Sequence, residues 1–416
     1  MTHDEKESET LLNARARSTA RVASVRAYVV AGGGADYHDQ ASGHWIDGQI
    51  ATPMSPYPEY RMTRSSFGLN ALGTVIVEVE SDTGEVGVGV STGGPPACWL
   101  VENHLARFVE GRPVHEIERS WDQMWRASLY YGRKGLAVNA ISAVDLALWD
   151  LLGRLREEPV HAMIGGAVRD EISFYATGPR PDLAREMGFV GGKMTLKHGP
   201  AEGTEGLRKN VEIFAEMRER AGDPDQFFMS YDCWMALDLT YALRLIDALA
   251  PYQLRWLEEF LPPDDYWGYA EARRRAPRDV LLSTGEHEWS RWGFRMLIDM
   301  GCADFVQPDV NWCGGMTELL KIAAYADAHD TPVIPHGSSV YSYHFVCTRP
   351  TTPYAEFLML HHDATEVIPM FSPLFLDEPV PVNGRIRVSA LDKPGFGVEI
   401  DPSLARERPF AREALV

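Results

Sequence analysis

The sequence is poor in cysteine and contains no close pair of cysteines. Its five cysteines are widely spaced and form no Cys-x-x-Cys motif, which argues against a disulfide framework or a zinc ribbon and predicts free thiols in a reducing cytoplasm. Long hydrophobic runs are also lacking, since none reaches the roughly 18 apolar residues of a membrane helix. We therefore expect a cytoplasmic protein with no membrane partner.

We expect no secretory leader in the first residues, because the stretch MTHDEKESETLLNARARSTAR has no apolar core. From its polar composition we expect residues 1–20 to form a mobile tail.

Positive charge is scarce too: the chain has 40 Lys and Arg but 59 Asp and Glu, which leaves a net charge of −19. Such a chain lacks the basic surface that nucleic acid requires, and a small anionic substrate would need local cations.

The remaining sequence divides into two regions with different patterns of apolar and polar residues. Residues 21–165 mix strand-like and helix-like patterns and predict an α+β domain. Thr74–Ser91 alternates around Asp82-Thr83-Gly84, which predicts a hairpin, and Asn139–Leu155 has apolar residues at helical spacing. Between Gly32 and Phe67 no period is visible, and a loop of that length is typically functional, often a lid.

Residues 166–374 repeat a strand-then-helix rhythm. Helix-like segments such as Tyr241–Leu249 and Met316–Ala328 separate eight short apolar runs, and this alternation predicts a closed parallel barrel. Residues 375–416 fit neither unit, and we expect them to return to the first domain. The eight runs are ISFYATG, FVGGKMT, QFFMSYD, LRWLEEF, VLLSTGE, DFVQPD, TPVIPHG and YAEFLM.

Six of these runs end on a polar residue, at intervals of 26, 28, 23, 27 and 20 residues. Because a barrel brings the C-terminal ends of all its strands to one mouth, we expect the six side chains to converge there. Three neighbouring carboxylates would repel one another without a cation, and oxygen ligands of this kind suit Mg²⁺. Taken singly, each could instead be a solvated loop residue or a helix cap. The six residues are Asp232, Glu258, Glu286, Asp309, His336 and Glu356.

Adjacent glutamates end the run LRWLEEF. Alternate side chains of a strand face opposite ways, so Glu258 and Glu259 are not expected to share a face. We assign Glu258 to the cavity and expect Glu259 to form a salt bridge behind the strand.

Several blocks resemble the enolase superfamily in its mandelate racemase-like branch: QFFMSYDCW, LLSTGEH, VQPDVNWCGG, VIPHGSSVYS and AVDLALWDLLGRLREEPVHAMIGG. The blocks DYHDQASGHWIDGQIATPMS, FYATGPRPDLAREMGFVGGKM and FLDEPVPVNGRI are more specifically similar to the L-rhamnonate dehydratases of that branch. The resemblance runs from about residue 21 to about residue 400. It implies a modified barrel, (β/α)7β, with an α+β capping domain, and a homo-oligomer.

The resemblance also implies roles for individual residues. Asp232, Glu258 and Glu286 would bind Mg²⁺, and His336 would act as the base, oriented by Asp309. Glu356 would form hydrogen bonds opposite the metal. From the long N-terminal loop, His38 and Arg64 would contact a small acid sugar. Apart from the resemblance, Trp45, Ile46 and Ile50 of the same loop are apolar and either cover the methyl end of a 6-deoxy sugar acid or only anchor the loop.

One departure from the superfamily bears on the reaction. Many relatives carry Lys-x-Lys at the end of the second barrel strand, whereas this chain has Lys193-Met194-Thr195. Without the second lysine we expect one base, His336, and hence syn dehydration of L-rhamnonate to 2-keto-3-deoxy-L-rhamnonate rather than racemisation. The alternatives are another acid-sugar dehydratase, a racemase or cycloisomerase, or a non-catalytic metal-stabilised binding protein.

Overall fold

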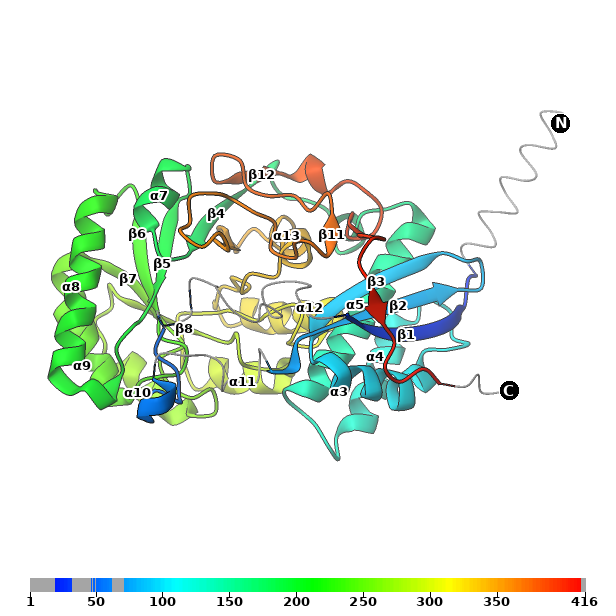
Figure 1. Ribbon diagram of the computed structural model, residues 1–416, viewed down its shortest axis with the longest axis horizontal. Coiled ribbons are helices and arrows are strands. Elements are labelled where there is room, and N and C mark those ends of the chain that lie inside the picture. The colour runs from blue at the N-terminus through cyan, green and yellow to red at the C-terminus, as the bar shows by residue number, and fades with distance from the viewer. Residues whose placement is uncertain (1–18, 32–45, 47, 49, 62–70, 413–416) are drawn as a thin grey trace.

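The computed structural model describes residues 19–31, 46, 48, 50–61 and 71–412. Two parts lie side by side along the long axis: a capping domain and a curled parallel sheet surrounded by helices (Figure 1). The predicted fold class, a modified (β/α) barrel with a capping domain, is confirmed.

The capping domain is built on an antiparallel sheet in the order β14-β1-β2-β3. The predicted hairpin is present, because β2 pairs with β3 in register from Thr74–Thr92 to Glu80–Val86. The strands are β1 (Val22–Val30), β2 (Thr74–Ser81), β3 (Val86–Thr92) and β14 (Arg406–Glu407), and the helices are α3 (Gly94–Leu100), α4 (Ile117–Ser128), α5 (Leu136–Arg156) and α6 (Val160–Met163).

Helix α5 packs directly onto the backbone of β3. A Cβ atom at Gly89 would lie 2.0 Å from the carbonyl oxygen of Ala143, and one at Gly87 would lie 2.3 Å from that of Ala147. Only glycine allows this approach. By length and composition α5 could cross a membrane, but 89% of its apolar window is buried inside the protein.

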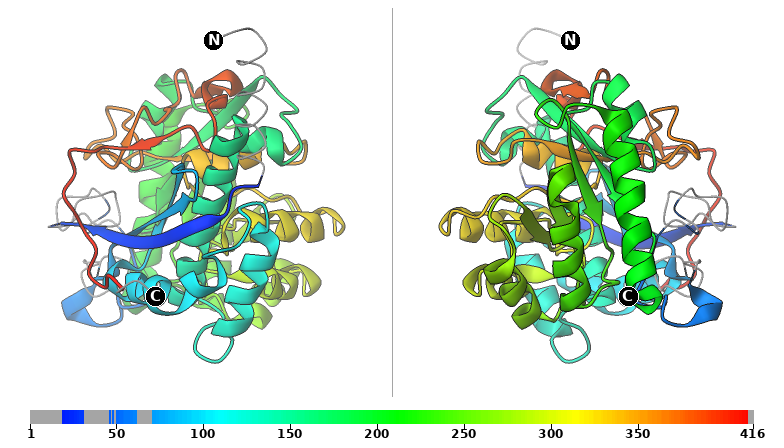
Figure 2. Two further views of the ribbon diagram at one scale, coloured as in Figure 1. Left: turned by 90° about the vertical axis from the view of Figure 1, so that its right-hand side faces the viewer. Right: turned by 90° about the vertical axis from the view of Figure 1, so that its left-hand side faces the viewer.

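The barrel sheet has the order β10-β4-β5-β6-β7-β8-β9, and helices such as α8 and α9 cover its outside (Figure 2). Its strands are β4 (Glu171–Thr177), β5 (Gly191–Thr195), β6 (Phe228–Asp232), β7 (Leu254–Glu258), β8 (Leu281–Thr284), β9 (Phe305–Val306) and β10 (Ala355–Leu358). Its helices are α7 (Pro181–Glu186), α8 (Gly203–Ala221), α9 (Leu239–Leu249), α10 (Tyr266–Arg275), α11 (Ser290–Asp299), α12 (Gly315–Asp327) and α13 (Val340–Val346).

The run TPVIPHG differs from its prediction as a strand. It contributes a single parallel bridge, between Val333 and Val306. Pro332 and Pro335 flank this bridge and have no N–H to donate, so a longer ladder cannot form. The backbone N–H of Gly337 nevertheless donates to Oε2 of Glu356 (2.9 Å), which joins this segment to β10.

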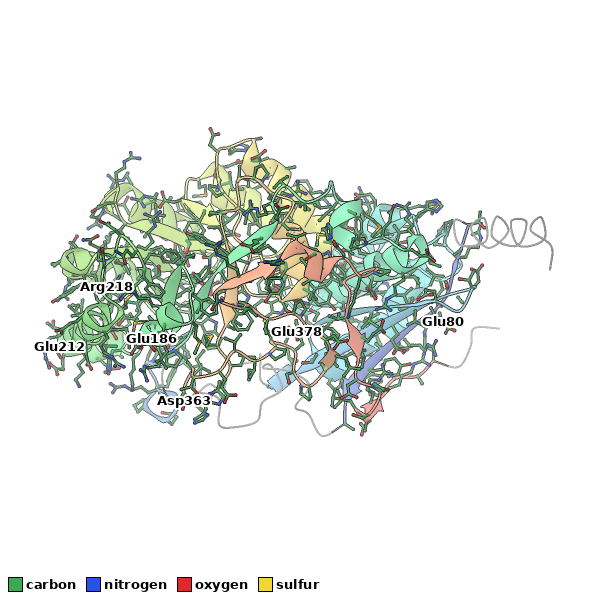
Figure 3. The ribbon with its side chains drawn as sticks, turned by 90° about the horizontal axis from the view of Figure 1, so that it is seen from above. Glu80, Glu186, Glu212, Arg218, Asp363 and Glu378 are labelled. Carbon is green, nitrogen blue, oxygen red and sulfur yellow. The ribbon has the colours of Figure 1, made fainter. Side chains whose placement is uncertain are left out.

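Residues beyond the barrel cross from it to the capping domain. They form β11 (Phe375–Leu376), β12 (Arg385–Arg387) and β13 (Glu399–Ile400) before β14 pairs with β1. Figure 3 shows Glu378 between Glu186 of the barrel and Glu80 of the capping domain. Glu378 is buried and accepts hydrogen bonds from the N–H groups of Met370 (3.1 Å) and Phe371 (3.0 Å).

Candidate active site

Three buried carboxylates come together at the C-terminal ends of adjacent strands. Asp232 ends β6 and Glu258 ends β7, where the two residues are register partners, and Glu286 lies two residues beyond β8. Oxygen atoms of the three all lie within 4.8 Å of one another. Gly285, with φ +128°, turns the chain just before Glu286, and this is a conformation that glycine adopts without strain.

Glu259 forms the expected salt bridge, with His287, but the expectation that it lies behind the strand is wrong. Its backbone adopts a φ of +41°, which ends the strand alternation. Its Oε1 accepts from the N–H of His287 (3.0 Å), and its Oε2 lies 2.8 Å from Nδ1 of the same residue. Ligand-type atoms of Glu259, Glu286 and His287 also lie within 4.8 Å of one another, so the salt bridge borders the carboxylate cluster.

Lys193, on β5, brings a positive charge into the cluster. Its Nζ donates to Glu258 and lies 2.8 Å from Oε1 of Glu356 and 3.6 Å from Oδ2 of Asp232. Burial lowers the pKa of Lys193, but Glu258 and Glu356 outweigh burial and raise it well above its usual range. Burial raises the pKa of Glu356, but Lys193, His336 and Thr177 together outweigh burial and lower that pKa to about 2.

The carboxylates fit a divalent cation. Burial raises the pKa of Glu286 to about 8, although His336 and His287 lower it, and raises that of Glu258 to about 7, although Lys193 lowers it. Because burial disfavours the charged form of these carboxylates, a further positive charge among them would stabilise that form. Hard oxygen donors in this number, with further positions left for water or substrate, are the ligands that Mg²⁺ prefers.

His336 and Asp309 form a dyad beside the cluster. Nδ1 of His336 lies 2.6 Å from Oδ2 of Asp309, whose Oδ1 accepts from the N–H of Asn311 (2.6 Å). Nε2 of His336 lies 3.5 Å from Oε1 of Glu286. Burial lowers the pKa of His336, but Glu286 and Asp309 raise it more, to about 10. A divalent cation on Glu286 would remove the largest of the raising contributions.

Glu356 lies on β10 and is held from three sides. Besides Lys193 and the N–H of Gly337, its carboxylate accepts from the hydroxyl of Thr177. All six residues predicted from the strand ends are therefore buried together at one mouth of the barrel. Their catalytic and metal-binding roles stay predictions.

Other side chains of the site were not predicted. Nε2 of Gln307 donates to Oε2 of Glu258 (2.8 Å), and Nε1 of Trp256 donates to the same atom (2.9 Å). The ring of Trp312 stacks on His336, and its Nε1 donates to Thr92 of the capping domain (3.0 Å). Gln307 had a detectable signal, because it stands two residues before Asp309 at a strand end.

His38, Arg64 and Trp45 lie outside the residues that the structure describes. The part of the same loop that is described reaches the barrel mouth, where the N–H of Ala51 donates to the carbonyl of Leu196 (2.7 Å). Ile50 packs with Trp234 and Met235, and Ile46 packs against this cluster. Trp234 follows Asp232 by two residues, so the apolar cluster borders the carboxylates.

Comparison with known proteins agrees with this architecture. Residues 52–165 match the family described as Mandelate racemase / muconate lactonizing enzyme, N-terminal domain, and residues 181–404 match Enolase C-terminal domain-like. Together with the barrel-mouth carboxylates, these matches define an enolase-like protein with a capping domain.

Individual relatives narrow the assignment. The chain is 63% identical to an L-rhamnonate dehydratase of Saccharopolyspora erythraea over 94% of its length and 99% of that protein. A structure of rhamnonate dehydratase from Gibberella zeae complexed with Mg aligns with a TM-score of 0.90 and 47% identity, covering 93% of this chain and 96% of that one. A 3,6-anhydro-D-galactonate cycloisomerase of Zobellia galactanivorans is more distant, at 28% identity and a TM-score of 0.70, covering 79% of this chain and 92% of that one. The chain belongs to the mandelate racemase and muconate lactonizing enzyme family, in the group that contains the L-rhamnonate dehydratases.

Proposed function

We propose that the protein dehydrates L-rhamnonate to 2-keto-3-deoxy-L-rhamnonate and water, with Mg²⁺ as cofactor. The observation that carries the proposal is the position of the His336–Asp309 dyad, whose second ring nitrogen, Nε2, lies 3.5 Å from Glu286 in a buried cluster of three carboxylates. The relatives described above support the choice of substrate and of metal.

Asp232, Glu258 and Glu286 would hold the metal. A proton next to a carboxylate is very weakly acidic, and bound Mg²⁺ supplies the positive charge that stabilises the negative charge developing when that proton leaves. Enolase-type sites in general pair a lysine or histidine base with Mg²⁺.

His336 would carry out both proton transfers. Its Nε2 takes the proton from carbon 2, while Asp309 keeps Nδ1 protonated and the ring oriented. The same imidazolium then gives its proton to the 3-hydroxyl, so the C3–O bond breaks and water departs from the face on which the proton was removed. The resulting enol tautomerises to the 2-keto-3-deoxy acid.

The neighbours of Lys193 support a single base. Relatives with a second base carry a lysine where this chain has Thr195, and Lys193 itself is engaged by Glu258 and Glu356. A two-base racemase would need a second unengaged base on the opposite face of the substrate. Dehydration by one residue needs none.

The apolar cluster of Ile46, Ile50, Trp234 and Met235 supports a 6-deoxy substrate. An apolar wall can cover a methyl group, whereas it leaves the 6-hydroxyl of L-mannonate without a partner. A difference of one such group between two substrates changes kcat/KM by about 10- to 200-fold, so we expect L-rhamnonate to react faster than L-mannonate by a factor in that range.

A panel of aldonic acids with Mg²⁺, scored for 2-keto-3-deoxy product, tests the proposal. L-rhamnonate should react best, with L-mannonate and L-lyxonate slower, and chelation or Asp232→Asn should abolish turnover. Full activity after exhaustive chelation would refute the metal site. Conversion of a different acid sugar, with none of these three reacting, would refute the substrate and leave the reaction class standing.

We also propose that the protein is cytoplasmic and self-associates. All five cysteines are free and buried, which fits a reducing compartment. Trp99, Tyr130 and Trp292 expose large apolar surface, which fits contact between copies. Light scattering on the purified protein measures the second point directly.

A further inference from the structure

The four residues that follow Gly285 contact the carboxylate site and the capping domain. Glu286 belongs to the carboxylate cluster, and His287 pairs with Glu259 beside it. Glu288 and Trp289 contact the capping domain instead: Nζ of Lys134 donates to Oε2 of Glu288 (2.9 Å), and Nε1 of Trp289 donates to Oδ1 of Asn139 (2.8 Å). The loop that bears one predicted metal ligand is thus fastened to the other domain.

Lys134 is the centre of this attachment. It lies between α4 and α5, and its Nζ also donates to Oδ1 of Asp264 (2.6 Å) and to the hydroxyl of Tyr266 (2.8 Å). That hydroxyl in turn donates to Glu288 (2.5 Å). The side chain of Lys134 is 34% exposed, whereas that of Glu288 is 1% exposed.

Lys134 supplies the cation for a carboxylate that water cannot reach. If Lys134 is removed, Glu288 becomes a buried charge without its counter-ion, which is costly. The carboxylate must then turn towards water, and turning moves the backbone of the loop. Because Glu286 lies two residues away, its carboxylate would lose its place in the cluster.

We propose that Lys134 is a positioning residue for the metal site. Through Glu288, the capping domain holds the loop Glu286–Trp289, and so fixes Glu286 where it can bind the cation together with Asp232 and Glu258. The inference rests on the magnesium site of the proposed function, but it does not depend on the substrate.

Isothermal titration of the full-length, chelator-treated protein with MgCl₂ tests the proposal without substrate. Lys134→Met should weaken Mg²⁺ binding by about tenfold, the lower end of what residues supporting metal ligands typically contribute. In turnover, the Mg²⁺ concentration for half-maximal rate should rise while kcat at saturating Mg²⁺ stays near that of the wild type. Lys134→Arg should bind Mg²⁺ normally, since a cavity of about 680 Å³ beside Lys134 leaves room for the larger head group.

Lys321→Met is the matched control. Lys321, on α12 of the barrel, pairs with Glu118, on α4 of the capping domain. This ion pair also joins the two domains. This change should leave Mg²⁺ affinity within about twofold of the wild type, because no residue of the loop Glu286–Trp289 takes part in the pair.

A second variant distinguishes loss of positioning from poor folding of Lys134→Met. Lys134→Met combined with Glu288→Gln leaves no buried charge, and it should recover Mg²⁺ affinity to within about threefold of the wild type. Wild-type affinity in Lys134→Met alone would overturn the proposal, as would equal weakening in Lys321→Met or no recovery in the double variant. If the wild type itself binds no Mg²⁺, the metal site of the proposed function fails instead.

Discussion

Asp309 contacts His336 through one oxygen, while the N–H of Asn311 holds the other. Both oxygens are therefore committed, and the ring of His336 is fixed between Asp309 and the stacked Trp312. At the scale of single residues, this arrangement fits the predicted role of Asp309 as the group that orients His336, and not as a metal ligand.

Asp309→Asn should lower kcat by about 10²- to 10⁴-fold, because the imidazole remains but loses its fixed tautomer and the carboxylate that stabilises its charged form. Mg²⁺ affinity and KM should change by only a few fold. Steady-state kinetics and metal titration measure both. A kcat within threefold of the wild type would show that His336 needs no orienting carboxylate.

Asp145, on α5, should make stability depend on pH. It is completely buried, its Oδ2 accepts from the N–H of Thr317 (3.0 Å), and burial raises its pKa to about 7. An unfolded aspartate titrates near ~3.9, so the folded state binds the extra proton. The stability that this proton contributes is fully present below about pH 4 and is lost as the pH rises to about 7.

Asp145→Asn should therefore flatten the decline in unfolding free energy between about pH 4 and 7 and raise stability at pH 8, by an amount on the order of a few kcal/mol. Thermal unfolding at several pH values measures the effect. Wild-type and variant curves that run parallel across that range would contradict it.

Most of the site could be predicted from the polar residues at the ends of the strands. Spacing placed Asp232, Glu258, Glu286, Asp309, His336 and Glu356 at one mouth, and the structure buries all six there. A salt bridge of Glu259 was expected, but its partner His287 and its position beside the cluster were missed, because both depend on one backbone angle, a φ of +41°. No sequence pattern marks that angle at a glutamate.

At the scale of elements, the contact of α5 with β3 fixes the capping domain. Gly89→Ala should destabilise the protein by about 1–3 kcal/mol, because the new Cβ would overlap the carbonyl of Ala143 and push α5 away. Gly199→Ala is the matched control, since its nearest neighbours would lie 3.7 Å away. Equal melting temperatures for the two variants would show that α5 is not tightly seated.

Elements with a clear period were predicted well, and those that depend on packing were not. The hairpin of β2 and β3 and the helix α5 follow directly from alternation and helical spacing. The segment TPVIPHG looked like a strand because it is apolar, but its two prolines limit it to one bridge. In this segment the two prolines lack the N–H donors that a strand needs, so the apolar pattern did not produce one.

At the scale of the whole molecule, both domains contact the residues around the site. Thr92 contacts Trp312, and Lys134 contacts Glu288, so the capping domain touches the loops after β9 and β8. The C-terminal residues complete the same domain, where Arg408 pairs with the buried carboxylate of Glu102. The sequence pattern indicated two domains. It could not predict these contacts between them, because they join residues far apart in the chain.

Proton exchange in deuterium oxide tests the central claim most directly. With Mg²⁺ and L-rhamnonate, the wild type should form the 2-keto-3-deoxy acid with deuterium at carbon 3, as followed by NMR. A folded, Mg²⁺-loaded His336→Asn variant should form no product and should leave the proton at carbon 2 unexchanged, because no second base replaces His336. Exchange at carbon 2 by that variant would contradict the single-base account and point to another base, such as Lys193.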